Sequence, residues 1–288
     1  MNERPRVVAL VADGIYQRYL VMRLAEEFEL VGLVVHAPPS PKGSLAERAR
    51  RYANPARLAK HLWARRAMRG YAARAAPVLA GLFHRDGREP SFPGYVPNVR
   101  VENINAAAAV SLIEQVCPDI VCVNGTNLLR EPMLALIPGI RHGIINLHTG
   151  LSPYSRGGNC DLFMLLEGRP EMVGITIHHI DKGIDSGDIV ITARPELSPD
   201  DNYEMIEAKS FRLGIDRMLV AVRQLAEHRA ERVRQWEEGK LFLRRTGYVY
   251  EPYHRVRVNR MLEAGLVADY LAHREDRDRG IRLVGSAN

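Results

Sequence analysis

Long apolar runs and patterned cysteines are both missing from this 288-residue sequence. No run approaches the roughly 20 apolar residues that cross a bilayer, and residues 1–11 lack the charged-then-apolar order of a signal peptide. The three cysteines, Cys117, Cys122 and Cys160, match neither a disulfide framework nor a zinc site in their spacing. We therefore expect a cytoplasmic chain with no membrane span, in which the cysteines are packing residues.

Acidic residues are scarce in one segment. Between Pro41 and Pro90, twelve lysine and arginine residues stand against three acidic residues, in a chain of net charge +6. Leucines recur here at helical spacing, so we expect two or three short helices. A solvated helical face is slightly favoured over a cationic surface for a phosphate-bearing substrate, a nucleic acid or a membrane. A second cluster mixes arginines with tyrosines between Arg244 and Arg260, a mixture also found in nucleotide and nucleic-acid sites.

Strand and helix patterns alternate along most of the chain. Arg6–Ala12 and Leu30–His36 are continuous apolar runs on either side of a helical pattern, and Asp119–Gly125 is a third such run. A short strand near residue 100 and a helix over Ala106–Gln115 lie between them. This alternation predicts an α/β fold whose mostly parallel sheet is covered by helices on both faces. Ligands bind such sheets beyond the carboxyl ends of the strands.

The stretch IINLHT, residues 144–149, ends a predicted strand with two polar side chains. Asn146 and His148 are two positions apart, so they point to the same side of the strand and can serve one reaction centre. An irregular glycine-rich loop follows, and residues 173–191 then predict a strand, a turn holding Asp181 and Asp185, and another strand. A lone Asn-x-His pair is more often a core histidine beside a turn residue, so the surrounding motifs decide between the two interpretations.

Together these motifs resemble the folate-dependent formyltransferases. The match comprises the Asn-x-His pair, the following Leu151, Pro153, Arg156 and Gly157, and the stretch GITIHHIDKGIDSGDIV that contains Asp185. The resemblance covers about residues 5–230, apart from a basic helical insertion at about 40–92. It implies a Rossmann-like catalytic domain over residues 1–230, with residues 231–288 as a small subdomain or tail. We expect this last part to hold a short strand or hairpin over 241–250 and a helix over 256–271.

The resemblance also implies site residues and a cosubstrate. Asn146, His148 and Asp185 would be catalytic, and 10-formyltetrahydrofolate would donate the formyl group. The residues expected to bind it are Asn124, Gly125, Thr126, Leu128, Leu129, Ile180, Asp181 and Gly183. Those expected to bind the acceptor are Gly14, Tyr154, Arg156, Gly157 and Gly158. No metal is expected, because the adjacent His178 and His179 would face opposite sides of a strand.

Formyl transfer needs the functional groups that these three catalytic residues carry. An imidazole near its ordinary pKa of about 6.5 removes the proton of the attacking amine, the role expected for His148. By analogy with hydrolase triads, Asp185 would hydrogen-bond the ring and stabilise the imidazolium. Asn146 would donate an N–H to the oxygen that becomes negative.

Departures from the family pattern indicate which acceptor to expect. The loop after the first strand has only Gly14 beside bulky Ile15 and Tyr16, which disfavours purine synthesis. Residues 231–288 are few for the β-barrel of methionyl-tRNA enzymes. We therefore expect an anionic amine, favouring an amino sugar on a nucleotide carrier. The alternatives are a methionyl-tRNA formyltransferase, a deformylase and a noncatalytic folate-binding protein. Deformylases carry an N-terminal regulatory domain, for which residues 1–5 leave no room. Nucleic acid as a partner is not favoured, and a homodimer is left open.

Overall fold

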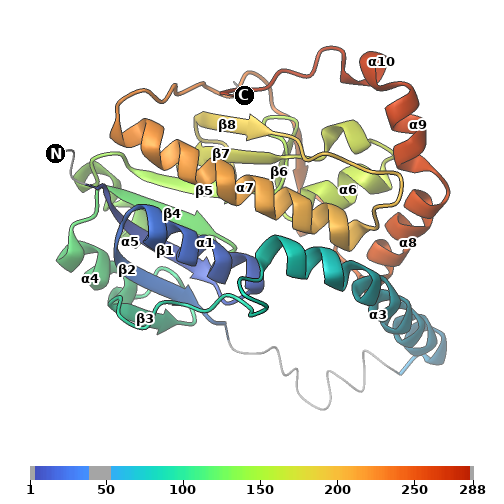
Figure 1. Cartoon of the computed structure of the whole chain (residues 1–288), viewed down its shortest axis with the longest axis horizontal. Helices are drawn as coiled ribbons and strands as arrows, with labels where there is room; N and C mark the ends of the chain where they lie inside the picture. The colour runs from blue at the N-terminus through green and yellow to red at the C-terminus, as the bar shows by residue number, and fades with distance from the viewer. Residues whose placement is uncertain (1–3, 39–52, 286–288) are drawn as a thin grey trace.

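The fold is built on one twisted sheet of seven strands. The computed structural model describes residues 4–38 and 53–285, and its strands lie in the order β3-β2-β1-β4-β5-β7-β8 (Figure 1). The first five pair in parallel, whereas β7 is antiparallel to both β5 and β8. The bounds are β1 Arg6–Ala12, β2 Glu29–His36, β3 Asn98–Val101, β4 Ile120–Asn124, β5 Ile144–His148, β7 Ile175–His179 and β8 Ile189–Ala193. The predicted α/β class and mostly parallel sheet are confirmed.

Helices cover both faces of this sheet. Apolar side chains of α1 and α7 pack with Phe83 on one face, and those of α4 pack with Met133 of α5 on the other. In Figure 1, α1 and α7 lie across the sheet. The bounds are α1 Ile15–Glu27, α4 Ala107–Val116, α5 Glu131–Leu134 and α7 Tyr203–Ala226, with the 3-10 turn η1 at Ile137–Gly139. The central strands are apolar throughout because both of their faces are buried.

The basic insertion forms one long helix, so the prediction of two or three short ones is wrong for the described part. Helix α3 runs from Pro55 to Phe83 with Pro77 inside it. Alanine, the strongest helix former, recurs along it, and this outweighs the one hydrogen bond lost at the proline. Asn202 donates to the Tyr71 carbonyl at 2.9 Å, which ties α3 to the start of α7. The first part of the predicted helical insertion, which holds the basic residues at positions 42–51, lies outside the described residues.

The chain after α7 packs back onto the catalytic part. Strand β9 (Lys240–Phe242) pairs in parallel with β6 (Ser155–Gly157), and the backbone N–H of Val284 donates to Thr192 on the edge strand at 2.7 Å. The expected helix over 256–271 is broken by Gly265, whose φ of +95° favours glycine. The remaining elements are α6 Cys160–Leu166, η2 Pro170–Met172, η3 Arg244–Thr246, α8 Pro252–Glu263, α9 Leu266–Ala272 and α10 Arg274–Asp278. The domain boundary near residue 230 stays a prediction.

Candidate active site

Strand β5 presents its two polar side chains on the face turned away from α7. Ile145 and Leu147 belong to the apolar core beneath α7, so the alternation of the strand directs Asn146 and His148 to the opposite face. Both lie in the carboxyl-terminal half of β5. The predicted shared direction of the pair is therefore present in the fold.

Asp185 reaches this pair from the loop between β7 and β8. Its φ of 47° lies in the left-handed region, which is uncommon outside glycine and asparagine. Two contacts hold it there: the Gly157 N–H donates to Oδ2 at 2.9 Å, and the Gln235 amide donates to the backbone carbonyl of Asp185 at 2.8 Å. The loop thus brings a carboxylate to the reaction face, although Asp185 follows Asn146 by 39 positions in the chain.

His148 is oriented by a backbone carbonyl. Its Nε2 lies 3.3 Å from the carbonyl oxygen of Ser155, so Nε2 carries the proton of the neutral ring and Nδ1 is the proton acceptor. Nδ1 lies 3.6 Å from Oδ2 of Asp185, which exceeds a hydrogen-bond distance. The expected hydrogen bond between Asp185 and the ring is therefore not formed in this structure. The Asp185 carboxylate acts on the ring through charge.

The electrostatics leave a neutral base beside an ionised acid. Burial lowers the pKa of His148, and the charge of Asp185 offsets this only in part. Burial alone would raise the pKa of Asp185, but His148, His178 and the Gly157 N–H outweigh it and hold that pKa well below its usual value. A neutral imidazole accepts a proton, and the adjacent carboxylate stabilises the cation that results.

His178 completes the cluster and was missed as a site residue in the sequence. Its Nε2 lies 3.2 Å from Nδ2 of Asn146 and 3.4 Å from Oδ1 of Asp185, while its Nδ1 lies 2.8 Å from the carbonyl of His179. Nδ1 therefore donates to this carbonyl, and Nε2 lies between the amide of Asn146 and the carboxylate of Asp185. No local pattern in the sequence indicated this, because His178 comes to lie opposite Asn146 only through the antiparallel pairing of β5 with β7.

Exposure divides the four residues into a buried back and an accessible front. The side chains of His148 and His178 are 6% and 1% exposed, and that of Asp185 is 16% exposed. Asn146 is partly exposed. A ligand therefore meets the amide and the carboxylate first.

The first expected folate-binding segment follows β4. Asn124 is buried, and its amide donates to the Leu147 carbonyl at 2.9 Å and accepts from Gln17 at 2.7 Å, so both of its ends are already bonded within the fold. Gly125 has a φ of +74° at the turn. Beyond Thr126, Leu128 is half exposed and Leu129 packs against the core. The accessible leucine offers apolar surface to a flat ring.

The second expected folate-binding segment follows β7. Asp181 accepts from the Gly183 N–H and from the Ser186 hydroxyl, both at 2.9 Å, which closes the turn. Lys182 lies 3.5 Å from Glu131 at the start of α5. This ion pair joins the turn to the segment after β4, and Ile180 packs in the same core cluster as Leu129. The two segments thus border one region.

The expected acceptor residues have different surroundings. Gly14 precedes α1 at the carboxyl end of β1. The hydroxyl of Tyr154 accepts from the Arg282 N–H at 2.7 Å, so this side chain anchors the C-terminal segment. Arg156 lies 3.7 Å from Glu238 and is 13% exposed. Gly157 binds Asp185, and a Cβ on Gly158 would meet open space. The structure places only Gly157 in direct contact with the catalytic cluster.

Two features are absent from the part of the chain that the structure describes. Within residues 4–38 and 53–285, no helix is long and apolar enough to cross a membrane. The same residues contain no group of three histidine, cysteine, aspartate or glutamate side chains arranged to hold a metal ion.

Known proteins with similar sequences share about half of this chain. A methionyl-tRNA formyltransferase of Syntrophus aciditrophicus is 29% identical over 137 residues, 48% of this chain and 43% of its own length. A cytosolic 10-formyltetrahydrofolate dehydrogenase of Xenopus tropicalis is 35% identical over 103 residues, 35% of this chain and 11% of its own length. This chain therefore spans less than half the length of these relatives.

Solved structures share the fold. Glycinamide ribonucleotide transformylase 1 from Symbiobacterium toebii has a TM-score of 0.51 at 18% identity, covering 81% of this chain and 96% of its own. A Mycobacterium tuberculosis protein described as a sugar N-formyltransferase candidate has a TM-score of 0.51 at 19% identity, covering 88% and 85%. The sequence matches the formyl transferase family over residues 18–222. The chain belongs to this family, whose formyl donor is 10-formyltetrahydrofolate.

Proposed function

We propose that this protein transfers the formyl group of 10-formyltetrahydrofolate to a primary amine, most favourably that of an amino sugar on a nucleotide carrier. The observation that carries the proposal is the cluster of Asn146, His148 and Asp185 on one face of the sheet. It combines a neutral base, an ionised acid and an amide N–H: the Asp185 carboxylate lies 3.6 Å from Nδ1 of His148 and 3.5 Å from Nδ2 of Asn146. These are the groups that acyl transfer to an amine requires.

The proton of the amine goes to His148. Its Nε2–H is held by the Ser155 carbonyl, so the free electron pair on Nδ1 accepts the proton as the amine bonds to the formyl carbon. The cation forms 3.6 Å from the Asp185 carboxylate, which stabilises it. The proton then passes to the nitrogen that leaves the formyl group, and tetrahydrofolate is released.

Asn146 acts on the formyl oxygen as that oxygen becomes negative. One N–H of its amide faces Nε2 of His178 at 3.2 Å, and the other has only a long contact of 3.5 Å with Asp185. The weakly held N–H is therefore available to the oxygen. Its partial exposure places it at the front of the cluster.

The residues present fit the formyl donor. Half-exposed Leu128 and partly buried Leu129 and Ile180 supply apolar surface, and backbone groups of the turn at Asp181 and Gly183 lie beside it. When bound, 10-formyltetrahydrofolate supplies the formyl group and a nitrogen that leaves it. The Lys182–Glu131 ion pair stabilises the frame between the two segments.

A second acceptor has one observation in its favour. Arg65, Arg66 and Arg69 of α3 are exposed, so this helix presents positive charge that suits the phosphates of a methionyl-tRNA. Residues 231–285 fold into one short strand and three helices packed on the catalytic part. This compact arrangement favours the small acceptor.

The test is release of tetrahydrofolate from 10-formyltetrahydrofolate by the purified chain. We expect release only when a nucleotide-linked amino sugar is present, and none with its N-acetylated form, which lacks a free amine. Faster release with methionyl-tRNA would assign the second acceptor. Release without any amine would indicate a deformylase, and donor binding without release would indicate a noncatalytic binder. Each of these last three results contradicts the proposal.

A further inference from the structure

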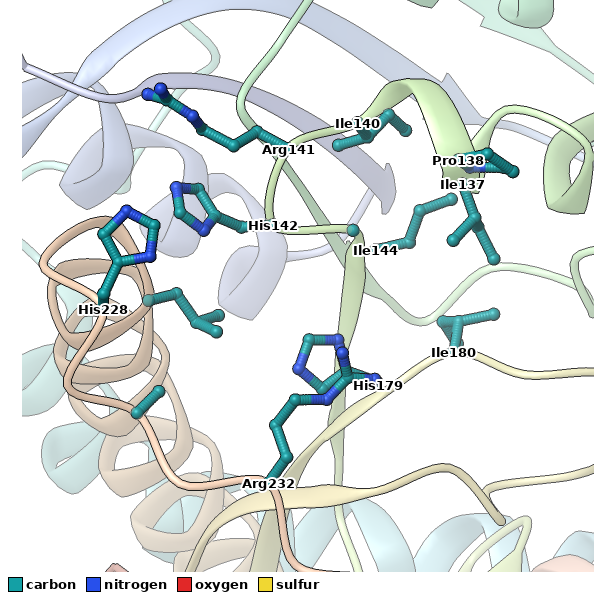
Figure 2. Close-up of a pocket in the computed structure, with 13 residues that line it drawn as sticks. Ile137, Pro138, Ile140, Arg141, His142, Ile144, His179, Ile180, His228 and Arg232 are labelled. Carbon is teal, nitrogen blue, oxygen red and sulfur yellow. The ribbon is translucent and has the colours of Figure 1, made fainter.

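A hollow of 480 Å³ lies at the end of the sheet opposite to the carboxyl end of β5. Gly143 and Ile144, at the start of β5, form part of its wall, together with Leu225 near the end of α7. In Figure 2, Ile137, Ile144 and Ile180 line one side, whereas imidazole and guanidinium groups line the other. The hollow therefore has an apolar wall and a nitrogen-rich wall.

The nitrogen-rich wall draws side chains from three segments of the chain. The rings of His142 and His228 are 5.2 Å apart, centre to centre, and Figure 2 shows them together on one side of the hollow. His179 and Arg232 lie together on another side, and Arg141 stands at the rim. Groups that carry or accept positive charge repel one another when they gather without a shared partner.

His179 has an unused buried nitrogen at this wall. The residue is 5% exposed, and its Nε2 is buried without a hydrogen-bond partner. A buried polar atom that lacks a partner destabilises the fold, and native proteins seldom leave one. Adjacent His178 faces the catalytic cluster from the other side of the strand, so the nitrogen of His179 serves no role there.

The carboxylates close to these groups are few. Asp188 lies 3.5 Å from Arg232, an ion pair with both partners substantially exposed. Asp119 acts on His142 from the turn before β4. Neither carboxylate bonds to Nε2 of His179. Two guanidinium groups also disfavour a metal cation, since a cation there would face positive charge.

We propose that this hollow binds a phosphate group, with His179 and Arg232 as its principal donors and His142 and His228 opposite them. A phosphate presents several oxygens and up to two charges, which suits donors that converge from different segments. The apolar side is formed by Ile137, Ile144 and Ile180 and accommodates a carbon body attached to the phosphate. The site lies apart from the reaction face, although Ile180 borders both.

The imidazoles make this binding depend on pH. Burial is the main cause that lowers the pKa of His179 to about 4; Arg232, His178 and His142 act in the same direction, and Asp188 acts against them. At neutral pH the ring is therefore uncharged, and a bound anion favours its protonated form. Binding should take up protons, so an anion whose own charge is the same at both values should bind more tightly at pH 6 than at pH 8.

His142 contributes in the same direction. Burial lowers its pKa, as do His228 and Arg141, while Asp119 raises it. An anion between these groups offsets their mutual repulsion. Bringing phosphate to the hollow should therefore shift the titration of His142 to higher pH, which NMR of the imidazole protons can follow.

The experiment is calorimetric titration of the full chain with inorganic phosphate and with sulfate against chloride at equal ionic strength, at pH 6 and pH 8. We expect saturable phosphate binding at both values, and tighter binding at pH 6 of sulfate, which carries two charges at both values. Arg232→Gln should weaken it roughly tenfold, the loss of one charge-assisted hydrogen bond. Arg229→Gln is the matched control, because Arg229 is exposed, does not line the hollow and lies three positions away.

Three results would overturn the proposal. The first is phosphate binding no better than chloride, and the second is an equal loss in the Arg229→Gln control. The third is displacement of phosphate by folic acid, which would assign the nitrogen-rich wall to the carboxylates of a folate. His228→Asn gives a second variant on the surface side, because asparagine tolerates the left-handed backbone of His228, whose φ is 55°, and it should also weaken phosphate binding.

Discussion

Nδ1 of His148 lies 3.6 Å from Oδ2 of Asp185, while Nε2 of the same ring lies 3.3 Å from the Ser155 carbonyl. The two contacts separate two functions that a hydrolase triad combines in one carboxylate. The Ser155 carbonyl fixes the tautomer, and Asp185 stabilises the charge. Removing the carboxylate should therefore leave the ring in place and change its proton affinity.

The first prediction is that Asp185→Asn lowers kcat and moves the acidic limb of the pH–rate profile to lower pH. Asp185 favours protonated His148, so the pKa of the imidazole falls when the negative charge is lost. The base then stays neutral to a lower pH. Asp181→Asn is the control on the same loop and should leave the limb unchanged. A limb that stays fixed in Asp185→Asn would show that Asp185 only shapes the loop.

The second prediction concerns His178 as a positioning residue for Asn146. His178→Ala removes the ring nitrogen 3.2 Å from the amide nitrogen, so the amide should lose its orientation and kcat should fall about tenfold or more, with the KM for the donor nearly unchanged. His178→Gln, whose side-chain oxygen can accept the same N–H, should restore part of the rate. Equal losses in both variants, with KM raised to match, would assign His178 to general packing.

The third prediction concerns a buried carboxylate beside the cluster. Burial raises the pKa of Asp161 to about 7, against the hydrogen bonds from the Gly174 N–H and the Ser210 hydroxyl. The folded state therefore keeps a proton that the unfolded state loses above its ordinary pKa of about 4. The stability from this group is fully present below that pH and is lost as pH rises through about 7.

Asp161→Asn should remove this dependence. Urea unfolding should show a free energy close to wild type at pH 4 and higher than wild type at pH 8, by on the order of a few kcal/mol. The asparagine can accept from Gly174 and donate to Ser210, so the contacts are kept. Asp200→Asn on the exposed loop is the control and should have no such effect. A variant less stable than wild type at pH 8 would contradict the sign.

The fourth prediction tests whether α3 recruits an anionic acceptor. Arg65 and Arg66 are exposed, and exposed charges are screened within a Debye length of about 8 Å at physiological ionic strength. Arg65→Glu with Arg66→Glu should raise the acceptor KM, and kcat/KM for the acceptor should fall with added salt while donor affinity changes little. Reversal of Arg274 on α10 and of Arg279, which directly follows it, is the control. An acceptor KM indifferent to salt and to both reversals would leave α3 as a solvated face.

Local patterns in the sequence predict much of the sheet and half of the cluster. Continuous apolar runs indicated β1, β2 and β4, and alternation along β5 put Asn146 and His148 on one side. These features depend on residues close together in the chain. The resemblance supplied Asp185, which no local pattern identifies, because its φ and its Gly157 contact arise from folding.

Features that depend on pairing between distant segments of the chain could not be predicted from the sequence. His178 joins the cluster only through antiparallel pairing with β5, and β6 exists because β9 lies beside it from 85 positions further on. The nitrogen-rich wall likewise gathers His142, His179 and His228 from separate elements. The length of α3 was underestimated because its leucines recur in short blocks. Its alanines occur throughout these blocks and favour one continuous helix.

The most direct test of the central claim is the single-turnover rate of His148→Asn, measured beside its affinity for the donor. If the neutral ring removes the amine proton, the single-turnover rate constant should fall by roughly 10² to 10⁴ while donor binding is kept, since general-base contributions are of this size. Asparagine is close to imidazole in size and cannot accept a proton at neutral pH. Turnover near wild type, with the donor bound equally well, would contradict the claim.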